Sequence, residues 1–171
     1  DPDQPLILET DEAFNTFEKI KISDLLVLNV DSDHLDYFKN LDNYKDAFYK
    51  VMKNVTDNLV INNDDLNIKS MKELKNPVSY GKDISADFKV QSPGTFIYEN
   101  NKYEIKSDII GDHFKSNMLG AIILALLNGI EIKDSLNAIE SFAGVKRRIE
   151  LIGISKGVLI YDDYGHHPTE M

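Results

Sequence analysis

The sequence predicts an α/β fold in which helices flank a mostly parallel sheet, with a small antiparallel sheet beside it. Two observations support this prediction. Short apolar runs bounded by polar residues, typical of buried strands, alternate with longer segments whose apolar residues recur at helical spacing. Between residues 78 and 110 the pattern changes to short strands separated by turn residues, which favours an antiparallel arrangement there.

The first half of the chain predicts three strands and two helices. The strands are short apolar runs at residues 6–8, 24–30 and 59–61. Residues 40–54 carry apolar side chains at the spacing of an amphipathic helix. Residues 62–65 are Asn and Asp, which cap helices well, so a short helix is expected to follow through about Leu74.

The second half predicts short strands followed by two helices and a final pair of strands. The strands lie at residues 78–80, 87–90, 96–99, 102–105, 149–152 and 158–161. Asn100 and Asn101 favour a hairpin turn, because asparagine tolerates positive φ. A strongly periodic helix begins at Gly111 and ends at Asn128, and a second helix ends at Gly144.

The composition bounds the class of protein. The 171 residues are 42% hydrophobic and 28% charged, which is ordinary for one globular domain. The net charge of −10 argues against a nucleic-acid or anionic-membrane surface, since phosphates need a basic footprint. The absence of cysteine excludes disulfides and thiol chemistry. No apolar stretch or leader suggests membrane insertion or secretion, so a cytoplasmic protein is expected.

Acidic residues and a histidine follow the first two predicted strands. Glu9, Asp11 and Glu12 come after residues 6–8, and His34 stands among aspartates after residues 24–30. Carboxylates and imidazole at strand ends can hold a hard cation such as Mg²⁺. Helix-terminal charge and a plain surface histidine are the competing interpretations, and the residues alone leave both open.

Two further segments suggest anion binding. The helix that begins at Gly111 exposes free N–H groups near His113, although simple capping by Asp112 explains the same pattern. Arg147 and Arg148 lie in the one concentrated basic segment of this acidic chain. Arginine is suited to paired contacts with phosphate oxygens, whereas the competing interpretation is a solvated turn.

Residues 162–170 (DDYGHHPTE) resemble the signature of the Mur ligases, in the branch that attaches L-alanine to UDP-N-acetylmuramic acid in peptidoglycan synthesis. Residues 29–36 are similar to the family's Asn-x-x-x-Asp-His-x-Asp motif, and residues 9–12 to its Glu-Ala-Asp-Glu run with Thr10 in place of Ala. Phe48 stands where most Mur ligases place a carbamylated lysine, and the L-alanine-adding branch also lacks that lysine.

The resemblance implies roles for individual residues. It makes Glu9 and His34 the catalytic Mg²⁺ ligands. It places four residues at ATP: His113, Asn117, Arg148 and Asp163. It directs five toward the other substrates: Asp11, Glu12, Tyr164, His166 and His167. Phe114 and Ile149 depart from the family pattern, where an Asn and an aromatic residue are usual.

The resemblance implies an ATP-dependent ligase that works through an acyl phosphate, with UDP-N-acetylmuramic acid, L-alanine, ATP and Mg²⁺ as its partners. Residues 1–146 are then part of the central ATP-binding domain, and residues 147–171 are the linker and first strand of the C-terminal domain. The family's Gly-Lys-Thr phosphate loop has no counterpart in this sequence, since Gly81-Lys82-Asp83 lacks the hydroxyl residue. We therefore expect this chain alone to be inactive, and its exposed sheet edges to favour self-association.

Three alternatives stay open. A ligase that recycles a whole tripeptide onto the same sugar acid shares the ATP machinery. A degenerate domain that binds nucleotide without catalysis would explain Phe114 and the missing phosphate loop. A metal-dependent hydrolase built on His34, His166 and His167 is the third, although no third ligand stands at metal-site spacing from the histidine pair.

Overall fold

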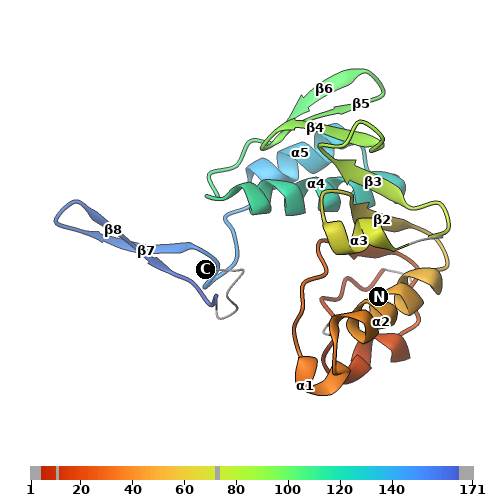
Figure 1. Cartoon of the computed structure of the whole chain (residues 1–171). Coiled ribbons are helices and arrows are strands. Elements are labelled where there is room, and N and C mark those ends of the chain that lie inside the picture. Colours follow the sequence, from red (N-terminus) through yellow and green to blue (C-terminus); the bar gives the residue numbers. More distant parts are fainter. Residues whose placement is uncertain (1–4, 11, 72–73, 166–171) are drawn as a thin grey trace. The chain divides into compact units, whose positions relative to one another are not determined.

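The structure is a computed structural model that describes residues 5–10, 12–71 and 74–165 (Figure 1). The chain divides into two compact units, Asp1–Val90 and Gln91–Met171. No helix among the described residues is long and apolar enough to cross a membrane.

Six strands form one mixed sheet in the order β1-β2-β3-β4-β5-β6. Strands β1 (Leu25–Val27), β2 (Leu59–Asn62), β3 (Val78–Gly81) and β4 (Phe88–Ser92) pair in parallel. Strands β5 (Thr95–Tyr98) and β6 (Asn101–Glu104) form an antiparallel hairpin. The predicted α/β class with a mostly parallel sheet is confirmed.

The direction of β3 and β4 differs from the prediction. They were expected in a separate antiparallel sheet, but β3 pairs in parallel with β2, and β4 pairs in parallel with β3. Their core residues Tyr80 and Phe88 are buried. Short strands between turn residues look alike in either direction, so the sequence pattern could not decide it. The β5–β6 turn also shifts by one residue, since Glu99 and Asn100 carry the positive φ values.

The core of the first unit lies between short helices and strands β1 and β2. Its helices are the 3₁₀ helix η1 (Ala13–Lys19), α1 (Leu35–Phe38), α2 (Leu41–Lys53) and α3 (Leu66–Ser70). Aromatic rings join them edge to face, with 5.1 Å between the ring centres of Phe17 and Phe48 and 5.0 Å between those of Phe38 and Tyr44. Helix α2 confirms the helix that the sequence predicts at residues 40–54.

The strand expected at residues 6–8 is wrong. Residues 5–10 have no regular structure, and Leu6 and Ile7 are 85% and 94% exposed. None of the strands in the described part of the chain pairs with them. An apolar run becomes a strand only when a neighbouring strand takes up its backbone hydrogen bonds, which the run itself does not reveal.

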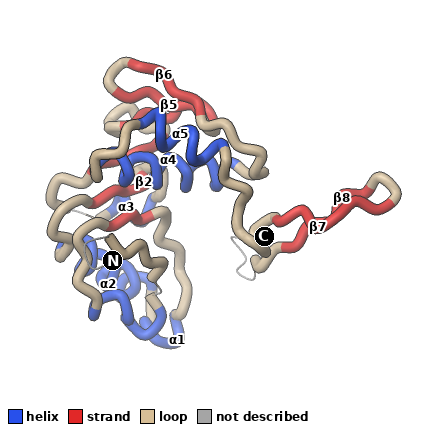
Figure 2. Tube along the Cα trace, turned by 180° about the vertical axis from the view of Figure 1, so that it is seen from behind, coloured by secondary structure: helices blue, strands red, loops and turns tan. Residues whose placement is uncertain are grey.

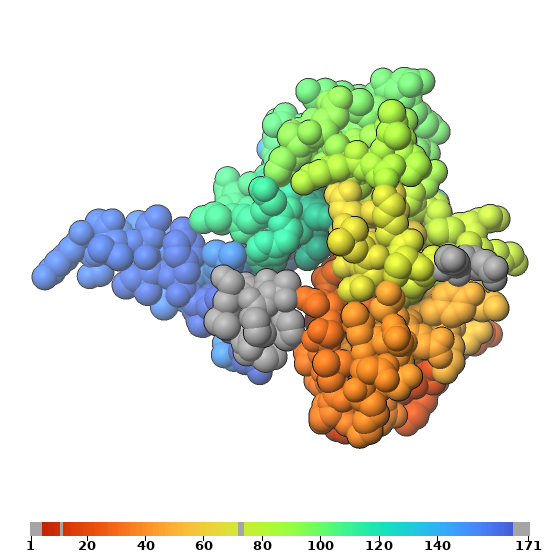
Figure 3. Space-filling view, viewed as in Figure 1, coloured from red at the N-terminus to blue at the C-terminus, as the bar shows by residue number. Residues whose placement is uncertain are grey.

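The second unit contains two helices and a separate hairpin. Helix α4 (Asp112–Leu127) buries Met118, Leu119, Ile122 and Ile123, and α5 (Ile132–Glu140) ends earlier than the predicted Gly144. Strands β7 (Glu150–Ser155) and β8 (Val158–Asp162) form their own antiparallel sheet (Figure 2). Most apolar side chains of this hairpin are exposed, and it is drawn in blue in the space-filling view (Figure 3).

Three side chains, one at the end of β2 and two after it, fix the segment that follows β1. The Nδ2 groups of Asn62 and Asn67 donate to the carbonyls of Leu28 (3.0 Å) and Val30 (2.6 Å). Asp65 accepts the Val30 N–H through Oδ2 at 3.2 Å and caps α3 by accepting the Ile68 N–H through Oδ1 at 2.8 Å. Parallel strands end at the same edge of a sheet, which brings these groups within reach of each other.

Replacing Asp65 with alanine is expected to lower the free energy of unfolding by about 1–3 kcal/mol, because it removes a helix cap and leaves the N–H of the buried Val30 without its partner. Urea unfolding followed by circular dichroism measures the loss. Asp57→Ala, at an exposed position, is the matched control and should be near neutral. Equal effects of the two substitutions would contradict this account of Asp65.

Replacing Gly111 with alanine is expected to cost about 1–3 kcal/mol of stability. Gly111 precedes α4 with φ of 120°, and an added Cβ would lie 2.7 Å from Cε1 of His113. Gly153→Ala is the control, because Gly153 has no positive φ and no heavy atom would lie within 4 Å of its added Cβ. Thermal unfolding of both variants measures the difference, and an unchanged midpoint for Gly111→Ala would refute the steric argument.

Candidate functional site

Glu12, Asp33 and His34 form the one cluster among the described residues in which three acidic or imidazole groups could hold a metal ion. Their ligand atoms all lie within 4.8 Å of one another. Nε2 of His34 is 4.0 Å from Oε1 of Glu12 and 3.9 Å from Oδ2 of Asp33. All three residues are half-buried, so water and a small cation can reach the cluster.

Tyr44 of helix α2 orients the Glu12 carboxylate. Its hydroxyl donates to Oε1 of Glu12 at 2.9 Å, and its ring is buried in the core. Burial raises the pKa of Tyr44 far above its usual value, and the charge and hydrogen bond of Glu12 raise it further. The phenol therefore stays protonated at any working pH and remains a permanent donor to Glu12.

The loop after β1 places the other two members of the cluster. His34 adopts φ of 50° as the residue before α1, a left-handed conformation that His tolerates better than most residues. The second carboxylate oxygen of Asp33, Oδ1, accepts the His34 N–H at 2.7 Å, and Oδ1 of Asp31 accepts the Ser32 N–H at 2.8 Å. The local backbone thus turns Asp33 Oδ2 and the imidazole toward Glu12.

The donor set suits a hard divalent cation. Mg²⁺ is usually held by one or two carboxylates together with waters, and Glu12 and Asp33 offer such oxygens, whereas the imidazole of His34 is a ligand more typical of transition metals. Glu9, the predicted partner of His34, is exposed in the irregular segment and is not a member of the cluster. Asp11 lies outside the described residues. Of the predicted site residues, His34 and Glu12 are therefore the two that the structure brings together at this cluster.

Sequence reasoning gave no role to two residues at this cluster. Asp33 belongs to the motif quoted for the loop, and its spacing next to His34 was the signal that could have assigned it. Tyr44 is one of the apolar residues of the helix predicted at residues 40–54. Only the structure shows that its hydroxyl reaches Glu12. A tyrosine among aliphatic core positions is the pattern that could have prompted the question.

A second group of predicted site residues lies in the second unit. The charges of Arg148 and His113 are close enough to Asp163 to help lower its pKa. His113 is exposed in the first turn of α4, and its ring centre lies 4.3 Å from that of Phe114. Asn117 lies one turn further along α4 and is half-buried. Positive charge near a helix N-terminus favours an anionic ligand.

Asp163 anchors the segment that follows β8. Its Oδ2 accepts the Ile149 N–H at 2.8 Å, and its Oδ1 accepts the Gly165 N–H at 2.6 Å. These two hydrogen bonds hold the pKa of Asp163 below its usual range, with the nearby Arg148 and His113 adding to the effect. Tyr164 packs against the guanidinium of Arg147, with Cζ 4.5 Å from the ring centre. His166 and His167 lie outside the described residues.

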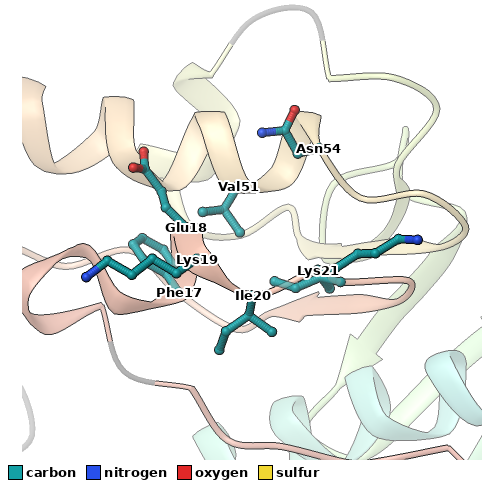
Figure 4. Close-up of a pocket in the computed structure, with 8 residues that line it drawn as sticks. Phe17, Glu18, Lys19, Ile20, Lys21, Val51 and Asn54 are labelled. Atoms are coloured by element: carbon teal, nitrogen blue, oxygen red, sulfur yellow. The ribbon is translucent and has the colours of Figure 1, made fainter.

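A groove of about 310 Å³ opens between η1 and helix α2 (Figure 4). Val51 and Asn54 of α2 line it together with six consecutive residues, Phe17, Glu18, Lys19, Ile20, Lys21 and Ile22. None of the predicted site residues lines this groove, and neither does any member of the cation cluster formed by Glu12, Asp33 and His34.

Comparison with known proteins gives a consistent family. Residues 11–125 match the Mur ligase middle domain. The UDP-N-acetylmuramate--L-alanine ligase of Dictyoglomus turgidum is 36% identical over 180 residues, covering 97% of this chain and 39% of the relative. The chain thus spans 34% to 40% of the length of these curated relatives.

Two solved structures share the fold. The UDP-N-acetylmuramate-alanine ligase of Thermotoga maritima superposes with a TM-score of 0.73 at 26% identity, over 91% of this chain and 38% of that one. The MurF ligase of Thermotoga maritima in complex with ADP gives a TM-score of 0.61 at 21% identity, over 88% of this chain and 37% of that one. Its residues 11–125 match the family's middle domain, and on its sequence and its fold together this chain belongs to the Mur ligase family.

Proposed function

We propose that this chain is part of an ATP-dependent ligase that adds L-alanine to UDP-N-acetylmuramate in peptidoglycan synthesis. The observation that carries the proposal is 36% identity, along 97% of the chain, to an enzyme of that name. Position 48 is Phe in this sequence, where most Mur ligases have a lysine. The L-alanine-adding branch also lacks that lysine, which supports this branch over the others. Since its substrates are a nucleotide sugar, ATP and a free amino acid, we place the enzyme in the cytoplasm.

The cation site of the proposed enzyme comprises Glu12, Asp33 and His34, and the two carboxylates supply oxygen ligands of the kind that Mg²⁺ takes. The resemblance adds Glu9 as a ligand and assigns Asp11 and Glu12 to the sugar-nucleotide side. A Mg²⁺ ion bound there would neutralise negative charge on the phosphoryl group being transferred. The Tyr44 hydroxyl donates to Glu12 and so holds that carboxylate in a fixed orientation.

The nucleotide side of the proposed enzyme comprises His113, Asn117, Arg148 and Asp163. Arginine remains charged at any working pH and makes paired contacts with phosphate oxygens, so Arg148 is the candidate for a direct phosphate contact. Tyr164, His166 and His167 are proposed at the remaining substrates, on the resemblance alone.

We further propose that residues 1–146 are part of the ATP-binding domain and that residues 147–171 begin the next one. The separate β7–β8 sheet supports a change of domain there. In the reaction, ATP phosphorylates the muramic acid carboxylate, and the L-alanine amine then displaces the phosphate from the acyl phosphate. This chain lacks a phosphate-binding Gly-Lys-Thr loop, so the reaction requires residues beyond these 171.

The function is tested with a longer protein that includes this chain and the remaining length of its relatives. Given UDP-N-acetylmuramic acid, Mg²⁺ and ATP, we expect phosphate release that depends on L-alanine, with little release on the tripeptide. The 171-residue chain alone should release none. Release with tripeptide instead would identify a recycling ligase, and ATP binding without release on either substrate would identify a non-catalytic nucleotide-binding domain.

The cation site is tested by titrating Mn²⁺, as a probe for Mg²⁺, into the 171-residue chain by calorimetry. Glu12→Gln is expected to raise the Kd for Mn²⁺ by about tenfold or more, because it removes a charged oxygen ligand from the cluster. Glu18→Gln is the matched control, because Glu18 is an exposed glutamate of the 3₁₀ helix that Glu12 precedes, and it should leave the Kd unchanged. A large effect of Glu9→Gln with none of Glu12→Gln would return the ligand role to Glu9.

A further inference from the structure

Both carboxylates of the cation cluster hold a hydrogen bond through one of their oxygens. Oε1 of Glu12 accepts the Tyr44 hydroxyl at 2.9 Å, and Oδ1 of Asp33 accepts the backbone N–H of His34 at 2.7 Å. Each bond uses a lone pair of its oxygen and fixes the rotation of the carboxylate. Two-oxygen ligation of one cation is therefore disfavoured at Glu12 and at Asp33.

The core fixes the position of the Tyr44 hydroxyl. The residue is 3% exposed, and its ring centre lies 5.0 Å from that of Phe38 and 5.1 Å from that of Phe48. The backbone of Glu12 is held as well, because its carbonyl accepts the Asn15 N–H at 2.8 Å. Since donor and acceptor are both held, the Glu12 carboxylate cannot turn without losing its hydrogen bond to Tyr44.

A site whose ligands give one atom each suits a small cation with an octahedral shell. Mg²⁺ takes near-octahedral ligands at about 2.0–2.1 Å and keeps several waters, whereas Ca²⁺ takes about six to eight oxygens at about 2.3–2.6 Å, often two from one carboxylate. Glu12, Asp33 and His34 each offer one ligand atom, and waters would complete an octahedron. The same three ligand atoms leave Ca²⁺ short of protein oxygens, and a fixed carboxylate cannot supply another.

We propose that Tyr44 is a specificity-determining residue of the cation site, which makes the site prefer Mg²⁺ or Mn²⁺ over Ca²⁺ by holding one oxygen of Glu12. The proposal rests on the proposed function, which puts a divalent cation at this cluster. Tyr44 acts through Glu12 and is not itself a ligand, so it is a positioning residue.

The test titrates Mn²⁺ and Ca²⁺ separately into the 171-residue chain by calorimetry and compares the two Kd values. Tyr44→Phe is expected to lower the ratio of the Ca²⁺ Kd to the Mn²⁺ Kd by about tenfold, because Glu12 becomes free to offer both oxygens to the larger ion. The Mn²⁺ Kd should change by less than about threefold. Phenylalanine keeps the ring in the core and removes only the hydroxyl, and circular dichroism checks that the variant is folded.

Tyr49→Phe is the matched control, because it removes a hydroxyl from the same helix at a half-buried ring that lies under Nζ of Lys53, 5.8 Å from the ring centre. It should leave both Kd values unchanged. If Tyr44→Phe weakened both cations by the same factor, the tyrosine would be merely structural and the proposal would be overturned. An unchanged ratio would overturn it too.

The same titrations separate this proposal from those on which it rests. Mn²⁺ binding with a ratio that ignores Tyr44→Phe would remove the role of Tyr44 and leave the cation site standing. Binding of neither ion by the original chain would remove the cation site and the selectivity together. The ligase reaction is judged independently, by L-alanine-dependent phosphate release from the longer protein.

Infrared difference spectra give a second readout that needs no enzyme activity. Two-oxygen ligation brings the antisymmetric and symmetric stretches of a carboxylate closer together than one-oxygen ligation does. Addition of Ca²⁺ should therefore give a smaller separation in Tyr44→Phe than in the original chain, and adding Glu12→Gln to that variant should abolish the difference. Identical Ca²⁺ difference spectra for the original chain and Tyr44→Phe would contradict the proposal.

Discussion

The parallel pairing of β1 with β2 is the constraint on which the rest of the first unit depends. Its register sets Leu25 opposite Leu59 and Val27 opposite Ile61, so both strands end at one edge of the sheet. There Asn62 at the end of β2 and Asp65 after it meet the backbone after β1, and they satisfy polar groups that burial would otherwise leave unpaired. The loop with Asp33 and His34 continues from that fixed backbone, which gives the cation cluster a rigid base.

Much of the fold was predictable because its segments are locally consistent. Helix α2 carries apolar residues at helical spacing, whereas α4 is apolar on most of its sides, and each ends at an asparagine, so the local sequence predicted both. Residues 6–8 and strands β3 and β4 were mispredicted for another reason. Pairing partner and strand direction are properties of distant segments, and a run of apolar residues carries no information about either.

The residues of the candidate sites were also predictable only where the local sequence carried the signal. His34 and Asp163 stood out because chemistry-bearing residues gathered where apolar runs ended. The hydrogen bond from Tyr44 to Glu12 joins residues 32 positions apart, and the left-handed φ of Ile149 contradicts what an isoleucine suggests. Both depend on tertiary contacts that override local preference, so they became visible only in the structure.

The left-handed backbone at His34 would constrain the metal selectivity of the proposed cation site. That conformation is acceptable to His, Asn, Asp and Gly and unfavourable to most other side chains. Replacing His34 by Cys or Glu to attract a softer or a harder ion would therefore change the ligand and strain the chain at once. The range of metals this position can be engineered to prefer is bounded by backbone conformation before ligand chemistry is considered.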